Sequence, residues 1–225
     1  MTLIEPKKLE VLPRPFFIVA EGMGDARFVG ELLQLNKITN CSIGCPSQES
    51  SKGMGKDAIP NYLASIQGAR TRVASVPLQG LLVVADADGD AAKSLESIVN
   101  ALRSAAFPAP SRAFSIEGAP LKVAIYLMPG EKETGTLEHL LLKAIFAKTP
   151  ALEKCIVGYS SCTGGLKSDK PNKHAKMRMS AIAATFCEDN PWASLCYMWD
   201  DKKQPVPMDS PHFGPFLNFV KAFAV

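Results

Sequence analysis

Three acidic residues stand directly after apolar runs of this 225-residue chain, in positions suited to metal chemistry. Glu21 follows the run at residues 16–20, and Asp86 and Asp88 follow the run at residues 80–85. Continuous apolar runs of this length are typical of strands buried on both faces of a parallel sheet. Ligand sites of such sheets lie beyond the carboxyl ends of the strands, so we expect the three carboxylates to converge at one edge.

Asp86 and Asp88 are two residues apart, and on an extended backbone their side chains would point to the same side. Two carboxylates held this close raise each other's pKa, and a bound cation relieves their repulsion. Mg²⁺ (or Mn²⁺) takes oxygen ligands of this kind. The competing interpretation is that an Asp after a strand only shapes the turn or caps the next helix. Asp90 suits that role, as the expected N-cap of the following helix.

Two further acidic residues extend the candidate metal site. Asp25 is expected either to cap a helix that begins at residue 26 or to join the site. Glu138 lies in the first turn of another expected helix, where the helix dipole favours an acidic side chain. A second ion, held by Glu138 with Asp90 or Asp25, would allow two-metal cleavage of a phosphodiester, with the ions roughly 4 Å apart.

Basic residues supply candidate phosphate contacts. Lys170, Lys173 and Lys176 recur every three residues, a spacing that keeps them on one side of a helix with a drift of about 60° per step. A row of ammonium groups suits phosphate binding, although a solvated helix face is the simpler interpretation. The glycine-rich segment at residues 51–57 does not match a nucleotide-binding loop. We expect a turn that ends in an Asp cap, from which Lys52 and Lys56 can touch phosphate.

The elements that must position these residues alternate between strands and helices. Expected strands cover residues 16–20, 41–44, 80–85 and 121–127, and expected helices cover 26–35, 59–67, 91–105, 136–148, 173–187 and 213–223. This order predicts a doubly wound α/β fold with a largely parallel sheet and a C-terminal helical extension. The expected organisation is an extended lead-in at 1–15, a core at 16–150, and a mainly helical extension at 151–225 packed on the core.

Composition sets the class of protein. The hydrophobic fraction of 47% supports a sizeable core, and the net charge of +3 is too small to indicate nucleic-acid binding by itself. The apolar runs are too short to cross a membrane and no export signal is visible, so we expect a soluble, cytoplasmic protein. Six cysteines are present, and the spacing of Cys41 and Cys45 could chelate zinc. No second pair completes such a site, so buried thiols are the favoured interpretation.

Two segments carry a family resemblance. Residues 18–22 (IVAEG) and 83–88 (VVADAD) resemble the two signature motifs of the TOPRIM domain, which occurs in topoisomerases, primases, OLD-family nucleases and a recombination mediator. Residues 21–28, residues 135–141 and the Lys-rich helix near 170 are similar to small stand-alone TOPRIM-like proteins. No ATPase domain accompanies these motifs, as one does in full-length OLD nucleases, so an ATPase partner would be a separate chain.

The resemblance implies a function. It implies Mg²⁺ held by Asp86 and Asp88, with Glu21 as general acid/base or additional ligand. The expected activity is that of a Mg²⁺-dependent nuclease or related phosphotransferase acting on DNA or RNA, as one component of a defence or repair system. The alternative is a non-catalytic TOPRIM module that binds metal, nucleic acid or a partner protein. A small-molecule phosphatase built on Asp-x-Asp ranks last, because Asp90 stands where that chemistry often wants a hydroxyl.

Overall fold

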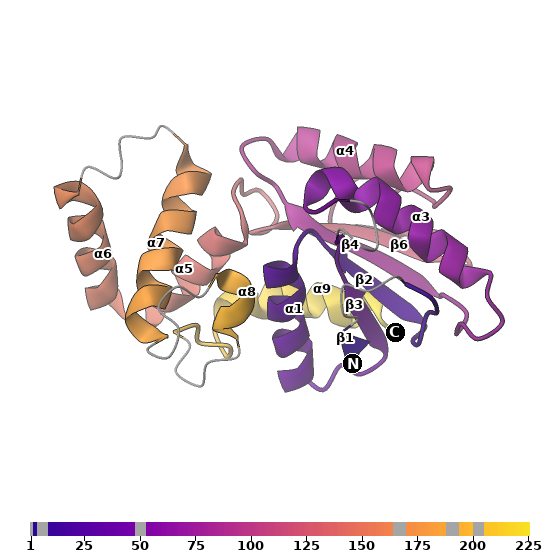
Figure 1. Cartoon of the computed structure of the whole chain (residues 1–225), viewed down its shortest axis with the longest axis horizontal. Coiled ribbons are helices and arrows are strands. Elements are labelled where there is room, and N and C mark those ends of the chain that lie inside the picture. The colour runs from indigo at the N-terminus through magenta and orange to yellow at the C-terminus, as the bar shows by residue number, and fades with distance from the viewer. Residues whose placement is uncertain (1, 4–8, 48–52, 164–169, 188–193, 200–204) are drawn as a thin grey trace.

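A six-stranded sheet forms the centre of the computed structural model, which describes the chain except for residues 1, 4–8, 48–52, 164–169, 188–193 and 200–204 (Figure 1). Within the described part, the strand order is β1-β3-β2-β4-β6-β5, and every pairing is parallel except that of β5 with β6. The strands are β1 (Thr2–Leu3), β2 (Phe16–Ala20), β3 (Cys41–Gly44), β4 (Gly80–Asp86), β5 (Ile116–Glu117) and β6 (Lys122–Met128). The predicted α/β class is confirmed.

The central strands are apolar on both faces because both faces are covered. Alternate residues of β2 join two different hydrophobic clusters: Phe16 and Ile18 belong to one, and Phe17 and Val19 belong to the other. Side chains of successive strand residues point to opposite faces, so one uninterrupted apolar run supplies both cores.

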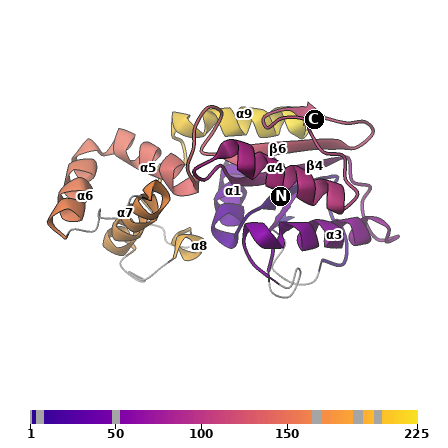
Figure 2. The ribbon, with the colours of Figure 1, turned by 90° about the horizontal axis from the view of Figure 1, so that it is seen from above.

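Helices cover the two faces of the sheet. One core contains residues of α3 (Ile59–Arg70) and α4 (Ala91–Ser104), and the other contains residues of α1 (Met23–Leu35), α5 (Leu137–Lys148) and α9 (Gly214–Phe223). The remaining helical elements are the 3-10 turns η1 (Lys56–Ala58) and η2 (Pro211–Phe213), α6 (Pro150–Cys162), α7 (Pro171–Phe186) and α8 (Leu195–Met198). Figures 1 and 2 both place α6 and α7 at one end of the molecule, away from the sheet.

The last helix completes the core of the sheet. The Phe223 ring of α9 packs edge-on against Phe16 of β2, with ring centroids 5.4 Å apart. Phe216 packs in the same way against Tyr126 of β6, at 4.9 Å. The side chain of Asn40 donates a hydrogen bond to the carbonyl of Ala224. The expected extension at 151–225 therefore contains an element that covers one face of the sheet.

The expected helices and strands match observed ones to within three residues at either end. Two expected caps are wrong. The turn after β2 is so short that α1 begins at Met23 with Gly22 as its N-cap, which leaves Asp25 inside the first turn. Asp57 lies within η1, and the N-cap of α3 is Ala58. The short strands β1 and β5 and the helix α6 were not among the expected elements.

Cys41 and Cys45 are buried free thiols, and burial raises the pKa of each to about 11. A thiol with such a high pKa remains protonated near neutral pH, which agrees with the expectation of buried thiols. Across the described residues, no helix is both long enough and apolar enough to span a membrane.

Candidate metal centre

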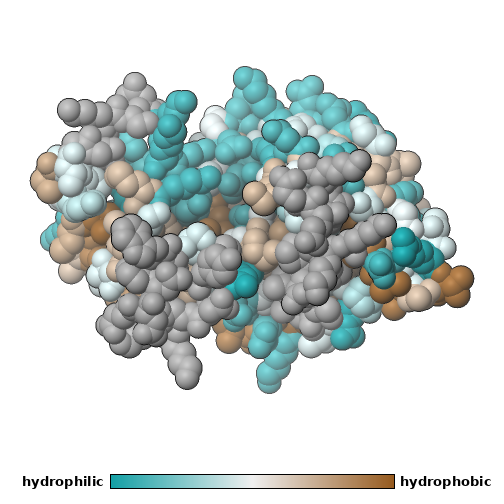
Figure 3. All heavy atoms as spheres, in the orientation of Figure 1, coloured by the Kyte–Doolittle hydropathy of each residue, from teal (hydrophilic) through white to brown (hydrophobic). Residues whose placement is uncertain are grey.

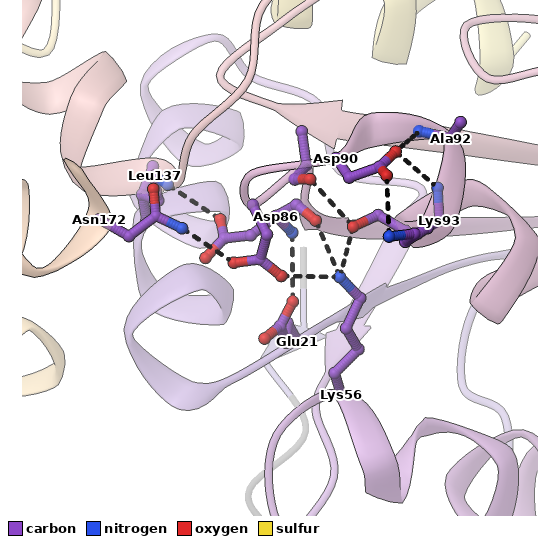
Figure 4. Close-up of polar contacts among 11 residues, drawn as sticks. Glu21, Lys56, Asp86, Asp90, Ala92, Lys93, Leu137 and Asn172 are labelled. Atoms are coloured by element: carbon purple, nitrogen blue, oxygen red, sulfur yellow. Dashed lines mark hydrogen bonds and ion pairs between the residues drawn. The ribbon is translucent and has the colours of Figure 1, made fainter. Parts of the chain in front are cut away.

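Glu21 and Asp86 meet because their strands are neighbours. β2 and β4 pair in parallel with Ala20 opposite Val84, so both strands end at the same edge of the sheet. The backbone N–H of Asp86 donates a hydrogen bond to Oε2 of Glu21, with the two atoms 3.1 Å apart (Figure 4). The predicted convergence of these two residues is therefore present in the structure.

Asp86 also connects the sheet to the start of α5. Its side chain is buried, and its Oδ1 accepts a hydrogen bond from the backbone N–H of Leu137 at 2.9 Å. A carboxylate at a helix N-terminus satisfies an otherwise unpaired N–H group and interacts favourably with the helix dipole. This contact brings Glu138, the next residue of α5, to the same edge of the sheet.

Four carboxyl groups from four segments share this edge, and we call them the carboxylate cluster: Glu21, Asp25, Asp86 and Glu138. Burial, together with the charges of the other three, raises the pKa of Asp86 to about 9. The pKa of Asp25 is raised to about 7 by desolvation, with added repulsion from Glu21 and Glu138. Burial also raises the pKa of Glu21, while the hydrogen bond from Asp86 opposes that shift. At neutral pH the metal-free cluster therefore keeps a proton on Asp86 instead of carrying its full negative charge.

Asp88 does not continue the strand that carries Asp86, against expectation. The strand ends at Asp86, and Asp88 has a φ of +54°, so the extended backbone that would align the two side chains is absent. Oδ2 of Asp88 accepts from Nζ of Lys56 at 2.9 Å, and Oδ1 accepts from Nδ2 of Asn172 at 3.2 Å. Asp88 therefore joins the sheet edge to the first turn of α7, which carries Asn172.

The contacts of Lys56 with the loop after β4, which carries Asp86 and Asp88, were not predicted from the sequence. Its ammonium group donates to Oδ2 of Asp88, to the backbone carbonyl of Asp86 at 3.1 Å and to Oγ of Ser94 at 2.7 Å (Figure 4). Three acceptors satisfy all three donors of a lysine, and only 19% of the Lys56 side chain is exposed. The sequence feature that could have pointed to Lys56 is the glycine-rich segment at residues 51–57, in which it lies. Lys52 lies outside the described residues.

Asp90 serves as the expected N-cap of α4. Its Oδ1 accepts from the backbone N–H groups of Ala92 and Lys93, both at 3.1 Å, and its Oδ2 lies 3.4 Å from Nζ of Lys93. These hydrogen bonds hold the pKa of Asp90 below its ordinary value. Asp90 therefore uses Oδ1 to cap the helix and Oδ2 in an ion pair with Lys93.

The three candidate phosphate-binding lysines separate into two places. Lys170 and Lys173 line a cavity of about 300 Å³ beside Asp88, at the start of α7. Lys176 lines a second cavity of about 190 Å³ together with Glu138, and its charge lowers the pKa of Glu21. Lys170 precedes the helix as its N-cap, so the three residues do not form one helical row. Figure 3 shows hydrophilic side chains gathered over α7 and α4.

The carboxylate cluster has the donor chemistry of a hard-cation site. Oε2 of Glu138 is buried without a hydrogen-bond partner among the described residues, which is unfavourable for a carboxylate oxygen. No three Asp, Glu, His or Cys side chains in the described part are arranged to share one ion. Mg²⁺ usually takes one or two carboxylates and completes its shell with waters and phosphate oxygens, so the cluster fits a partial protein shell.

The family of the chain follows from comparison with known proteins. No curated protein and no solved structure matches the sequence. The model of one family, described as a protein of unknown function (DUF3226), matches residues 15–224. That span includes every residue of the carboxylate cluster together with Lys56, Asp88 and α7. The chain therefore belongs to the DUF3226 family.

Proposed function

We propose that this protein holds Mg²⁺ or Mn²⁺ at the carboxylate cluster and cleaves or transfers phosphodiesters of nucleic acid. The observation that carries the proposal is the convergence of Glu21, Asp25, Asp86 and Glu138 on one sheet edge. Burial and mutual repulsion raise pKa values to about 7 and about 9, which a divalent cation would reverse by displacing protons. Asp88 belongs to the proposal as a candidate ligand after displacement of Lys56.

The bound cation would polarise a phosphoryl oxygen and lower the pKa of a coordinated water. Asp86 and Glu138 are the residues best placed to hold it, because Asp86 is central to the cluster and Glu138 has an unpaired buried oxygen. Asp86 keeps one oxygen on the N–H of Leu137, which fixes the orientation of its carboxylate.

Glu21 is the proposed general base. Burial raises its pKa above the ordinary carboxylate value, and general bases work best when their pKa lies close to the working pH. In hydrolysis, the water oxygen would form a bond to phosphorus, its proton would pass to Glu21, the bond from phosphorus to the sugar oxygen would break, and the leaving sugar oxygen would take a proton from solvent water. Lys176, whose charge acts on Glu21, would stabilise the negative charge that develops on the phosphoryl oxygens.

The test is calorimetric titration with Mg²⁺ and Mn²⁺, with a cleavage assay on DNA and RNA oligonucleotides. Three proteins are compared: the native chain, Asp86→Asn, and Asp209→Asn as a matched change of an exposed aspartate. We expect metal binding and metal-dependent cleavage in the native and Asp209→Asn proteins, and loss of both in Asp86→Asn.

Two other results would change the conclusion. Metal binding without cleavage of any oligonucleotide would favour the non-catalytic module, which binds metal, nucleic acid or a partner protein. Equal metal affinity in all three proteins would refute the assignment of the cation to Asp86. The proposal places the protein in the cytoplasm and includes an ATPase as a candidate protein partner.

A further inference from the structure

The cavity at the start of α7, which we call the α7 cavity, shares only Asp88 with the metal chemistry proposed above. It lies between the loop after β4, the segment before α5 and the first turn of α7, with a volume of about 300 Å³. Asp88 and Gly135 form its inner side, where each donates its backbone N–H to the carbonyl of the other at 2.7 Å. The cavity therefore adjoins the edge of the sheet that carries the carboxylate cluster.

The groups around the α7 cavity favour an anion. Lys170 and Lys173 line it with exposed side chains, and the N-terminus of the 16-residue helix α7 faces it with the positive end of the helix dipole. Asp88 is the acidic residue among those that line it, and both oxygens of Asp88 already accept hydrogen bonds from Lys56 and Asn172. The remaining positive charge has no anionic partner in the described lining.

His139 adds a directed donor. Its Nδ1 accepts a hydrogen bond from the backbone N–H of Thr136, with the two nitrogens 3.1 Å apart. Because Nδ1 accepts this hydrogen bond, the ring hydrogen lies on Nε2. Gly135 permits this placement, because a Cβ there would lie 2.8 Å from Nδ1. The ring lines the cavity with Nε2–H as its remaining donor.

The size of the cavity limits what can enter. About 300 Å³ is at the lower end of the range for small-molecule sites and accommodates one nucleotide. Pro171 and Gly89 supply uncharged walls beside the basic groups. A nucleotide within a duplex is paired and stacked, and it must leave the helix to enter such a site, at a cost of a few kcal/mol.

We infer that the α7 cavity binds one nucleotide of an unpaired nucleic-acid strand, with its phosphate held by Lys170, Lys173 and His139 at the positive end of the α7 dipole. The substrate class is then single-stranded DNA or RNA, or a frayed strand end. This inference rests on the proposed function, because it takes the neighbouring carboxylate cluster as the place where the adjoining phosphodiester reacts.

The test measures binding apart from cleavage, by fluorescence anisotropy with labelled single-stranded and duplex oligonucleotides of DNA and of RNA, without added metal. Gly89 offers a graded way to fill the cavity, because a Cβ built there meets nothing within 4 Å and its backbone is outside the left-handed region. We expect Gly89→Ala to weaken single-strand binding slightly and Gly89→Leu to weaken it at least tenfold. Lys154→Gln, an exposed change on α6, is the control.

A second variant tests the phosphate contacts. Lys170→Gln/Lys173→Gln should reduce the dependence of the single-strand affinity on salt, by about 0.7 in the log–log slope for each phosphate that the variant no longer neutralises. We expect the native protein to bind single strands at least tenfold more tightly than duplexes. Equal affinity for both, or unchanged affinity when Gly89→Leu fills the cavity, would overturn the inference.

The two proposals can fail separately. Cavity-dependent binding of single strands without metal-dependent cleavage would remove the proposed chemistry and leave the inference intact. Cleavage that depends on Asp86 but is indifferent to Gly89→Leu and to strandedness would leave the chemistry intact and remove the inference. Circular dichroism of each variant, compared with the native spectrum, separates loss of binding from loss of folding.

Discussion

Replacement of Asp86 by Asn should make the metal-free protein more stable at neutral pH. The Asp86 carboxyl is 8% exposed, and its pKa rises from the ordinary 3.8 to about 9 in the folded chain. At pH 7 this group is ionised in the unfolded chain and must take up a proton on folding. About three pH units separate 3.8 from 7, each worth about 1.4 kcal/mol, so proton uptake costs about 4 kcal/mol at most.

The expected gain is smaller than this limit, because neighbouring carboxyl groups share the proton uptake. An Asn side chain has a similar shape, and its oxygen can still accept the hydrogen bond from the N–H of Leu137. We therefore expect Asp86→Asn to increase the free energy of unfolding by about 2 kcal/mol at pH 7, or to raise Tm by about 4–8 °C for a chain of this length.

The dependence on pH has a definite sign. A raised folded-state pKa means that the folded chain binds more protons than the unfolded chain, so native stability falls as pH rises from about 4 towards about 9. Asn does not titrate, so the stability difference between variant and native protein should vanish near pH 4 and grow with rising pH.

Urea unfolding at several pH values between about 4 and about 8.5 measures this difference. Asp209→Asn, which changes an exposed aspartate, should behave like the native protein throughout. A gain that does not vary with pH, or a loss of stability at neutral pH, would refute the reasoning that folding forces the buried Asp86 carboxyl to take up a proton.

Three further variants test other parts of the structure. Lys56→Met should lower the free energy of unfolding by about 2 kcal/mol, because three acceptors lose a largely buried charged donor. Urea unfolding measures this loss, and no change would mean that Lys56 is only a solvated surface residue. Phe223→Ala should cost about 3–5 kcal/mol, measured in the same way, and a cost below about 1 kcal/mol would mean that α9 is dispensable to the sheet. Glu138→Gln should weaken Mn²⁺ binding at every pH, because it removes the charge of a proposed ligand, and should also shift the onset of binding to lower pH, because one charge that raises the pKa of Asp25 and Asp86 is lost. Calorimetry across pH measures that shift, and an unchanged pH dependence would separate Glu138 from the cluster.

The central strands were predictable because a strand that is buried on both faces of a sheet needs a continuous apolar run, and the sequence contains such runs. The strands at 16–20 and 80–85 followed from their continuous apolar runs. The meeting of Glu21 with Asp86 followed because parallel strands end at the same edge of a sheet. The helices were equally accessible, since apolar residues recur at helical spacing where a helix packs on a sheet.

The parts that were missed depend on contacts between distant segments. The position of Asp88 follows from its φ of +54° and from bonds to Lys56 and Asn172, which are 32 and 84 residues away. A two-residue spacing fixes side-chain direction only while the backbone stays extended. The role of Lys56 was missed for a similar reason. Its hydrogen bonds depend on the position of η1 next to the loop after β4, and no local motif predicts them.

The closure of the sheet by α9 has a consequence for how this chain folds. The Phe223 and Phe16 rings pack together although about 200 residues separate them, and Asn40 reaches Ala224 over 184 residues. Contacts of such long range slow folding, because a long loop must close before they form. Until residues 214–223 leave the ribosome, Phe16 and Tyr126 have no aromatic partner from α9, and this apolar sheet face is open to chaperones. Folding of this sheet should therefore be completed only after α9 has been synthesised and has left the ribosome.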